Sequence, residues 1–236
     1  MKIAIMQPYF FPYIGYFQLF KSVDVYVFYD DVNYIKKGWI NRNYILLNKK
    51  KHLLTVPCKS ISQNKPINCI QIDKENKTYK KILKTVAVAY KNKAPYFDYV
   101  FPVLKNVMHS NSCTISMLAI ESITSVSTYL GIKNKMLVSS RDFSETKNLR
   151  NSERIITICK KLGATEFINA IGGMALYDKN YFYEQGIRLS FIKPLENICY
   201  AQGNNQQFIP WLSMIDVLMF NSPETVNMML DRYILT

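Results

Sequence analysis

The first thirty residues alternate short apolar runs with turn residues, in an order typical of α/β proteins. Lys2–Met6 is an apolar run that predicts a buried strand, and Gln7–Pro12, rich in proline and aromatic residues, predicts a turn. Gly15–Lys21 predicts a short helix, and Val25–Tyr29 predicts a second strand. This order makes a βαβ unit, in which the two strands are parallel and the crossover is right-handed. We therefore predict that Lys2–Met6 pairs in parallel with Val25–Tyr29.

The rest of the chain predicts further strands and helices. His52–Pro57 predicts a third strand, closed by its proline. Apolar residues at helical spacing predict three helices, at Lys77–Asn92, Tyr96–His109 and Thr114–Leu130. The later expected elements are strands at Lys135–Ser139, Thr165–Ala170 and finally Arg188–Ile192, and helices at Ser152–Leu162, Lys179–Gln185 and finally Ile209–Phe220. We predict one α/β domain over residues 1–236, an open parallel sheet with Rossmann-like winding and a helical insertion near 77–132.

In open parallel sheets, ligands bind beyond the carboxyl ends of the strands, where the strand order reverses. This rule selects four loops of the predicted sheet, at 7–15, 30–42, 139–147 and 169–178. Candidate functional residues are therefore sought there.

Composition adds bounds on the kind of protein. With 236 residues, 49% of them hydrophobic, the chain can bury a sizeable core. No run approaches the roughly 20 apolar residues of a membrane helix, and the first residues lack a signal-peptide core. We therefore expect a cytoplasmic protein with no membrane span.

The formal net charge of +13 raises the question of a nucleic-acid partner. The excess is mostly lysine, at Lys36-Lys37, at Lys49–Lys51, between Lys74 and Lys93, and at Lys133 and Lys135. There is no arginine-rich arm and no nucleic-acid-binding motif. We interpret these lysines as a solvated face with some affinity for phosphate, and a nucleic acid is not the expected partner.

Cysteines and histidines offer little for a metal site. The five cysteines are far apart, without a CxxC pair, and we expect reduced, mostly buried thiols. Cys159 falls among apolar residues of a predicted helix, which favours a core role over a nucleophile. The two histidines, His52 and His109, lie at a lysine-rich strand start and at a helix end, which leaves little material for a metal site or a histidine-based triad. No metal is expected, and the sequence names no cofactor.

An aromatic motif follows the first predicted strand. Tyr13-Ile14-Gly15-Tyr16 has the spacing of the HIGH signature of the nucleotidyltransferase (HUP-like) and class I synthetase group, with tyrosine replacing both histidines, and it occupies the same place before the first helix. A helix N-terminus offers free N–H groups to a phosphate or carboxylate. A phenol also donates a hydrogen bond to phosphate, although it is not cationic near neutral pH. An aromatic plug that packs the loop explains these residues equally well.

The same opening resembles that of the WbqC-like protein family. The similar segments are Ile5–Tyr16, Ser22–Asp24, Tyr29–Val32, Asn41-Arg42, Thr55–Pro57, Ser139-Ser140, Arg154, Cys159–Ala164, Tyr177, Gly186-Ile187, Tyr200–Gln202 and Leu212–Leu218. The resemblance covers nearly the whole chain. It implies an enzyme that builds surface polysaccharides, notably the O-antigen of lipopolysaccharide, with a role in making or modifying amino sugars. The chain departs from the family at Asn169–Gly173, where an alternating Gly/Ser pattern is expected.

Polar residues on the selected loops supply candidate catalytic and binding groups. Asp30 ends the second strand, where a carboxylate can bind a ribose hydroxyl, an amine or a water, or can cap a turn. Asp30, Tyr13 and Tyr16 form the candidate catalytic set. The candidate ligand-binding residues are Gln7, Gly15, Lys36, Arg42, Ser139, Ser140, Arg154, Gly172, Gly173 and Tyr177.

Each of these residues also has a structural alternative. Arg42 has the planar fork that matches phosphate and Lys36 is a point charge, but a solvated loop accounts for the lysine equally well. Arg154 lies within a helix and can instead pair with an internal acid. Gly172-Gly173 permits close approach of a ligand to the backbone, or an ordinary turn.

Several aromatic and polar residues stay undecided. Trp39 and Tyr34 can stack on a base or sugar ring, or fill core space. Tyr200–Gln202, Ser213 and Asp216 can contribute to the cleft or hold the last helix on the sheet.

Our leading hypothesis is an enzyme of surface-polysaccharide precursor synthesis that transfers an acyl or aminoacyl group to the amine of a nucleotide-linked amino sugar. The alternatives are nucleotidyl or adenylyl transfer, and a noncatalytic nucleic-acid-binding or scaffold protein. The partner expected is a nucleotide sugar or another phosphate-bearing small molecule. We further predict that Gln7, Tyr13, Gly15, Tyr16, Asp30 and Arg42 converge in one cleft. Replacing Arg42 by alanine should then weaken a phosphate-bearing ligand by about 1.5 to 3 kcal/mol while melting stays nearly unchanged.

Overall fold

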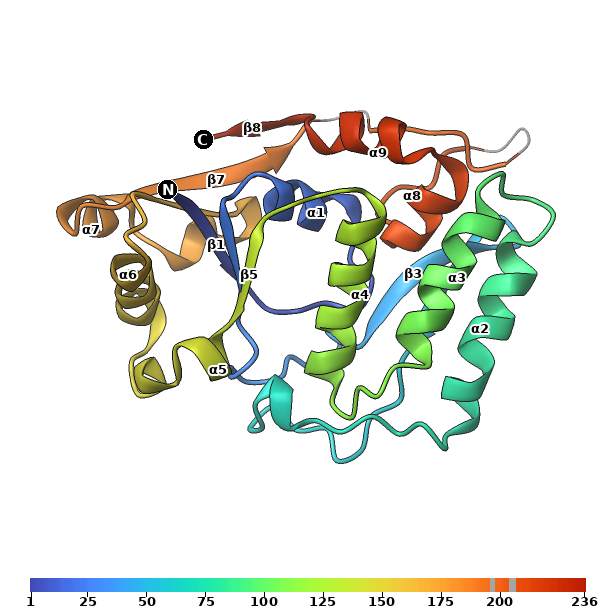
Figure 1. The fold of residues 1–236 in the computed structure, drawn as a ribbon, viewed down its shortest axis with the longest axis horizontal. Coiled ribbons are helices and arrows are strands. Elements are labelled where there is room, and N and C mark those ends of the chain that lie inside the picture. The colour runs from blue at the N-terminus through green and yellow to red at the C-terminus, as the bar shows by residue number, and fades with distance from the viewer. Residues whose placement is uncertain (196–197, 204–206) are drawn as a thin grey trace.

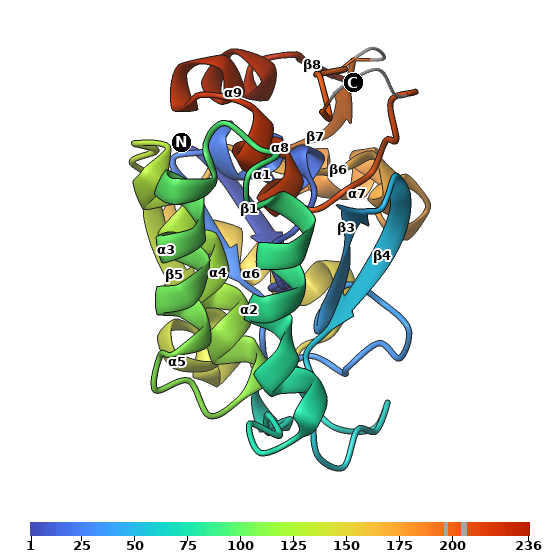
Figure 2. The same cartoon turned by 90° about the vertical axis from the view of Figure 1, so that its right-hand side faces the viewer.

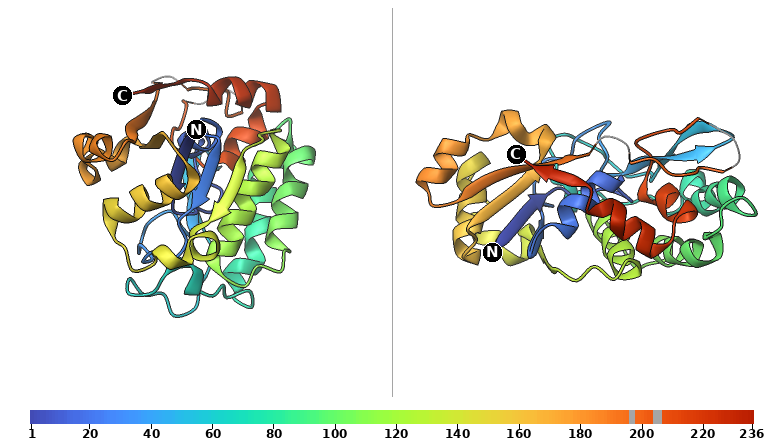
Figure 3. Two further views of the ribbon diagram at one scale, coloured as in Figure 1. Left: turned by 60° about the vertical axis from the view of Figure 1, so that its left-hand side comes forward. Right: turned by 90° about the horizontal axis from the view of Figure 1, so that it is seen from above.

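The computed structural model describes residues 1–195, 198–203 and 207–236, and in these residues a six-stranded sheet lies between layers of helices (Figures 1 and 3). The strand order is β5-β2-β1-β6-β7-β8. The strands are β1 (Lys2–Met6), β2 (Val25–Phe28), β5 (Lys135–Val138), β6 (Glu166–Ala170), β7 (Arg188–Pro194) and β8 (Tyr233–Leu235). β1 pairs in parallel with β2, with Ile3 opposite Val25, so the predicted βαβ unit is confirmed. The mostly parallel α/β class is confirmed as well.

Apolar residues on alternate positions of the strands face two separate cores. Ala4, Tyr26 and Phe28 belong to the larger core, under α1 (Ile14–Lys21), α4 (Ile115–Tyr129), α8 (Met214–Phe220) and α9 (Pro223–Leu230). Ile3 and Ile5 face the other core, with α6 (Asn151–Leu162) and α7 (Lys179–Glu184). Because side chains alternate across a strand, a continuous apolar run supplies both faces of a buried sheet.

The three consecutive helices predicted in the middle of the chain are confirmed as α2 (Lys77–Tyr90), α3 (Phe97–Met108) and α4. The side chain of Asn76 accepts a hydrogen bond from the Thr78 N–H at the start of α2, and that of Thr114 accepts one from the Met117 N–H at the start of α4. Such caps satisfy backbone donors that the helix itself leaves free. Figure 2 shows these helices side by side, with a β-hairpin next to α2.

The prediction of a third strand at His52–Pro57 is only partly right. The strand is β4 (Lys50–Thr55), and it pairs antiparallel with β3 (Arg42–Leu47) in a separate two-stranded sheet. β3 was not expected. Asn48 and Lys49 join the strands with φ of 50° and 61°, as a type I′ hairpin turn requires, because its twist matches that of the strands.

The C-terminal end also differs from the prediction. β7 is not the final strand, because β8 pairs antiparallel with it at the edge of the sheet. The predicted helix from Ile209 begins only at Met214, where Ser213 caps α8 by accepting from the Ile215 N–H. A second helix, α9, follows with Pro223 in its first turn, where the missing N–H of proline has no cost.

Short helices occupy parts of the expected loops. Residues Ser139–Asp142 form α5, directly after β5, and Ile171–Leu176 form a 3₁₀ helix after β6. Two further 3₁₀ segments lie at Ile67–Cys69 and Ser144–Thr146. In the described part of the chain, no helix is long and apolar enough to cross a lipid bilayer.

Candidate functional site

The strand order reverses between β1 and β6, and a cavity of about 450 Å³ lies at the carboxyl ends of these two strands. The chain runs from β1 outward through β2 and β5 on one side, and from β6 through β7 on the other. This is the position at which open α/β sheets bind ligands. We call it the switch-point cavity; it is lined by residues of three of the four expected loops, among them Gln7, Tyr9, Tyr13, Gly15, Val32, Ile35, Trp39, Asn169, Gly172, Gly173 and Tyr177.

Two carboxamides face this cavity from the two strands at the reversal. Gln7 follows β1 directly, and Asn169 lies near the end of β6 with 6% of its surface exposed. The Asn169 Oδ1 accepts the Ala170 N–H at 2.9 Å. Within the described residues, neither side-chain NH₂ group donates a hydrogen bond to the protein. A carboxamide offers both donors and an acceptor, so this pair suits a ligand with hydroxyl or amide groups.

Gly173 is required for the position of Asn169. A Cβ at residue 173 would lie 2.3 Å from Asn169 Nδ2, a distance that no two such atoms tolerate. At the neighbouring Gly172, an added Cβ meets nothing within 4 Å. The two adjacent glycines therefore differ in what they do: the first is open to solvent, and the second lets the carboxamide pack against the backbone.

Four phenols add hydrogen-bond donors to the cavity. Burial, with the nearby Tyr13 as a second cause, raises the pKa of Tyr9 to about 12. Burial also raises the pKa values of Tyr13, Tyr29 and Tyr177. All four hydroxyls stay protonated near neutral pH and can donate. Among the described residues that line the cavity, none is Asp, Glu, His, Lys or Arg.

A second cavity of about 480 Å³ adjoins the first, and we call it the apolar chamber. Tyr13, Gly15, Ile171 and Pro194 line both cavities. The remaining lining comes mostly from the segment before α8 and includes Ile198, Cys199, Tyr200, Phe208, Trp211 and Leu212, with Val217 from α8 and Lys193 from β7. The start of α1 thus lies between a cavity whose lining includes carboxamides and phenols and one lined almost entirely by apolar side chains.

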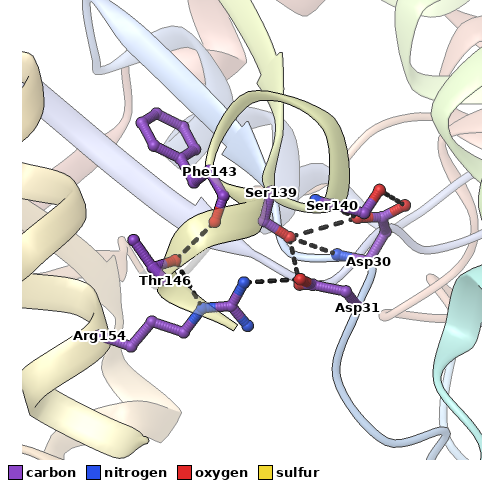
Figure 4. Close-up of polar contacts among 7 residues, drawn as sticks. All are labelled: Asp30, Asp31, Ser139, Ser140, Phe143, Thr146 and Arg154. Atoms are coloured by element: carbon purple, nitrogen blue, oxygen red, sulfur yellow. Dashed lines mark hydrogen bonds and ion pairs between the residues drawn. The ribbon is translucent and has the colours of Figure 1, made fainter. Parts of the chain in front are cut away.

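Asp30 and Asp31 lie beyond β2 in a buried network with residues after β5 (Figure 4). Asp30 accepts the Ser140 N–H at 3.1 Å and its hydroxyl at 2.9 Å. The Ser139 hydroxyl lies 2.5 Å from Asp31 Oδ1 and 3.2 Å from Asp30 Oδ1, so its one proton serves one carboxylate at a time. The Asp30 carboxylate thus does not cap its own turn; it accepts from Ser140, 110 residues away, and ties the loop after β2 to the start of α5.

Arg154 reaches the same network from α6. Its guanidinium donates to Asp31 Oδ2 at 2.6 Å and to the Thr146 hydroxyl at 3.0 Å, and both partners of the ion pair are almost fully buried (Figure 4). The guanidinium also lies 4.9 Å from the centre of the Tyr29 ring, which lines the switch-point cavity. The alternative foreseen for Arg154, pairing with an internal acid, is what the structure shows.

The structure brings some of the predicted site residues together and separates others. The candidates that line the switch-point cavity are Gln7, Tyr13, Gly15, Gly172, Gly173 and Tyr177. Tyr16 is 2% exposed and its phenol donates to the Gln7 carbonyl at 3.0 Å, inside the larger core. The Arg42 guanidinium donates to the carbonyls of Lys37 and Gly38, and Lys36 is exposed. Ser139, Ser140 and Arg154 belong to the buried network.

The expectation of mostly buried cysteines is wrong. The thiols are free, but only Cys159 is buried, whereas Cys69, Cys113 and Cys199 are exposed and Cys58 is half-buried. Cys159 lies on a helix that faces the sheet, while the exposed thiols lie in or beside loops. Among the described residues, no three side chains of His, Cys, Asp or Glu are grouped to hold a metal ion.

Sequence reasoning missed the place of Asn169 in the switch-point cavity and the whole apolar chamber. Asn169 began one of the selected loops and was noted as a departure from a Gly/Ser pattern, but it was not among the candidate binding residues. Nothing in the sequence indicated that Trp211 lines a cavity, since an isolated tryptophan is usual in a core. In the structure it is 65% exposed, with its ring edge-to-face with Tyr13 at 5.9 Å.

Residues 7–228 match the WbqC-like protein family, and this range includes all the described lining residues of both cavities except Ile5 and Met6. The chain belongs to the WbqC-like protein family. A relative in Mycobacterium tuberculosis (strain ATCC 25618 / H37Rv), named Uncharacterized protein Rv1507c, is 28% identical over 193 residues, which are 80% of this chain and 81% of that protein. No solved structure matches the chain. The suspected family membership is confirmed.

Proposed function

We propose that this WbqC-like protein is an enzyme of surface-polysaccharide precursor synthesis that transfers an acyl or aminoacyl group to the amine of a nucleotide-linked amino sugar in the cytoplasm. The family resemblance supplies the pathway. The observation that carries the binding role lies at the strand-order reversal, where the side-chain NH₂ groups of Gln7 and Asn169 have no protein partner among the described residues. This pair supports a ligand rich in hydroxyl and amide groups, as a sugar is.

The cavity suits an acceptor that enters with its sugar toward the carboxamides. Gln7 and Asn169 bind ring hydroxyls, while the protonated phenols of Tyr9 and Tyr13 donate to oxygen atoms. The first turn of α1 has no side-chain cap, and its positive dipole end favours the diphosphate. Trp39, 39% exposed at the rim, offers a face for the base.

The chemistry needs an activated acyl or aminoacyl ester or thioester as the co-substrate. The amine nitrogen attacks the acyl carbonyl carbon, an N–C bond forms, and the bond to the leaving oxygen or sulfur breaks. The amine loses one proton and the leaving group takes one up. Tyr13, at the boundary between both cavities, donates to the carbonyl oxygen as negative charge develops there, since its raised pKa keeps the phenol protonated. Asp30 and Arg154 act as positioning residues. Asp30 holds the loop after β2 in place, and Arg154 holds the ring of Tyr29, which lines the cavity.

Nucleotidyl transfer is the second candidate, because Tyr13-Ile14-Gly15-Tyr16 begins α1 beside the cavity. The burial of Tyr16 weakens it, since only one of the two tyrosines faces the ligand site. Release of pyrophosphate from a nucleoside triphosphate would distinguish this reaction from acyl transfer.

The glycine pair gives a sharp test of the binding role. In a Trp211→Phe background, Trp39 is the remaining tryptophan and its fluorescence reports on the switch-point cavity. Gly173→Ala must displace the Asn169 carboxamide and should weaken a nucleotide-linked amino sugar by about tenfold, the scale of one hydrogen bond lost to a polar ligand. Gly172→Ala is the matched control and should bind as the parent does. Equal effects of the two variants would refute the role of Asn169.

The reaction itself is tested by mass spectrometry, with nucleotide-linked amino sugars and activated acyl donors incubated with the intact protein. The expected product is the N-acylated nucleotide sugar. The remaining alternative, a noncatalytic nucleic-acid-binding protein, is tested by measuring the melting temperature with nucleotide sugars and with RNA. A higher melting temperature with RNA, without any response to nucleotide sugars, would contradict the proposal.

A further inference from the structure

We propose that the apolar chamber is the subsite for the acyl group of the donor, and that this group is aliphatic or aromatic rather than small and polar. The inference rests on the proposed acyl transfer and names its donor class. The chamber's volume of about 480 Å³ falls in the range of small-molecule sites. Its lining is dominated by Ile, Leu, Val, Pro, Phe and Trp side chains, and among its described residues Lys193 is the one that carries a full charge.

Tyr200, one of the residues that line the chamber, is tied to the buried core by hydrogen bonds. The Tyr200 phenol lines the chamber and donates to Asp216 Oδ2 at 2.7 Å, and Asp216 is fully buried. The same carboxylate accepts the Tyr90 hydroxyl at 2.6 Å. The rings of Tyr200 and Phe208 are edge-to-face, with their centres 5.2 Å apart. A lining residue that is already fixed by hydrogen bonds loses less entropy when a ligand binds against it.

The side chain of Trp211 is largely exposed to solvent rather than buried. Its φ of 64° lies in the left-handed region that residues other than glycine rarely adopt. The strain is maintained by its neighbours: the Ser213 N–H donates to the Tyr44 carbonyl at 2.7 Å and the Ser213 hydroxyl to the Phe11 carbonyl at 2.7 Å. A strained, exposed aromatic residue beside an apolar cavity indicates a ligand contact.

The chamber and the switch-point cavity share a boundary at Gly15. A Cβ at this position would lie 2.6 Å from Tyr13 Cε2 and 3.3 Å from Pro194 Cγ, two residues that line both cavities. Gly15 is helical and not in a left-handed conformation, so glycine is needed for this close approach and not for its backbone. An acyl group in the chamber therefore presents its carbonyl carbon at Tyr13, where the acceptor amine arrives.

The test uses the Trp39→Phe protein, in which Trp211 is the remaining tryptophan. Its fluorescence then reports on ligand binding in the chamber that it lines. The probes are the acetyl, hexanoyl and decanoyl thioesters of N-acetylcysteamine. We expect the fluorescence of Trp211 to respond, with about fourfold tighter binding for each added methylene group until the chamber is full. Ile198→Phe, which adds bulk to the chamber, should weaken the decanoyl probe at least tenfold, whereas Ile35→Phe, in the other cavity, should leave it unchanged.

The outcomes separate this inference from the proposed function. Affinity that does not rise with chain length, or equal effects of Ile198→Phe and Ile35→Phe, overturns the acyl subsite. If the chamber binds the probes as expected but Trp39 does not respond to nucleotide sugars, the acyl subsite stands and the proposed acceptor is wrong. A thermal melt of each variant shows that it is folded, so a loss of binding is read as a loss of the site.

Discussion

Tyr90→Phe removes one oxygen atom from a buried junction between α2, β3 and α8. The Tyr90 hydroxyl donates to Asp216 Oδ1 at 2.6 Å and accepts the Leu46 N–H at 3.1 Å, and the residue is 1% exposed. The ring itself is retained in phenylalanine, so its packing against Phe220 is kept. The substitution therefore isolates the contribution of two hydrogen bonds.

The expected loss of unfolding free energy at neutral pH is about 1.5 to 3 kcal/mol, the value of one hydrogen bond to a charged group. The Leu46 N–H adds little to this loss, because the carboxylate of Asp216 is itself within reach of that amide. Tyr183→Phe is the matched control. Its ring is 80% exposed, and the change should stay within about 0.5 kcal/mol.

The deficit should also depend on pH. Burial raises the pKa of Asp216, while the hydrogen bonds from Tyr90, Tyr200 and Gln202 lower it in part. An acid with a raised folded pKa contributes stability that is fully present below its unfolded pKa and is lost as pH rises through the folded pKa. Without the Tyr90 bond the folded pKa rises further, so the deficit of Tyr90→Phe grows from mildly acidic to neutral buffer.

Urea unfolding of both variants and the parent, at neutral pH and in buffer just above the ordinary pKa of an aspartate, measures this effect. The reasoning is refuted if Tyr90→Phe costs no more than Tyr183→Phe. A deficit that is the same in both buffers would show that the charge of Asp216 plays no part.

Arg154→Met leaves the buried Asp31 carboxylate without its ion partner and should cost about 3 to 5 kcal/mol in the same assay, and adding Asp31→Asn should restore part of the loss. No recovery in the double variant would contradict an energetic role for the pair. In the native protein a thiol reagent should modify the exposed cysteines quickly, while Cys159, which is buried and whose pKa is raised to about 12 by burial, should react only after unfolding. Rapid labelling of Cys159 in the folded protein, followed by peptide mass spectrometry, would show that α6 opens readily.

Local patterns predicted most of the framework because they depend on residues close in sequence. The apolar run of β1, the turn and the short α1 together imply parallel pairing with β2, since a crossover helix leaves no other arrangement. Helical spacing located α2, α3 and α4 to within two residues at each end. The hairpin of β3 and β4 was missed, because its signal is the pair Asn48-Lys49 in a left-handed turn, which is weaker than the Asn-Gly type.

The candidate site was predicted at the level of loops but not of side chains. Tyr13 and Tyr16 are three residues apart, yet Tyr13 precedes the helix and faces both cavities, whereas Tyr16 lies on the first turn and faces the core. Which tyrosine meets a ligand depends on how α1 is rotated against the sheet. Similarly, Arg42 has the side chain for phosphate, but its guanidinium is used by the carbonyls of its own loop.

By itself the sequence determined the α/β class, the first βαβ unit, the family and the edge of the sheet at which the switch-point cavity lies. The class and the βαβ unit follow from short-range periodicity and from rules of chain connection, whereas the family follows from the resemblance of separated motifs. Only the tertiary structure decided that the segment before α8 closes a second cavity against α1. The Ser213 hydroxyl meets the Phe11 carbonyl across 202 residues of chain. Contacts over such a separation are formed by packing of the whole domain, so no local pattern of residues predicts them.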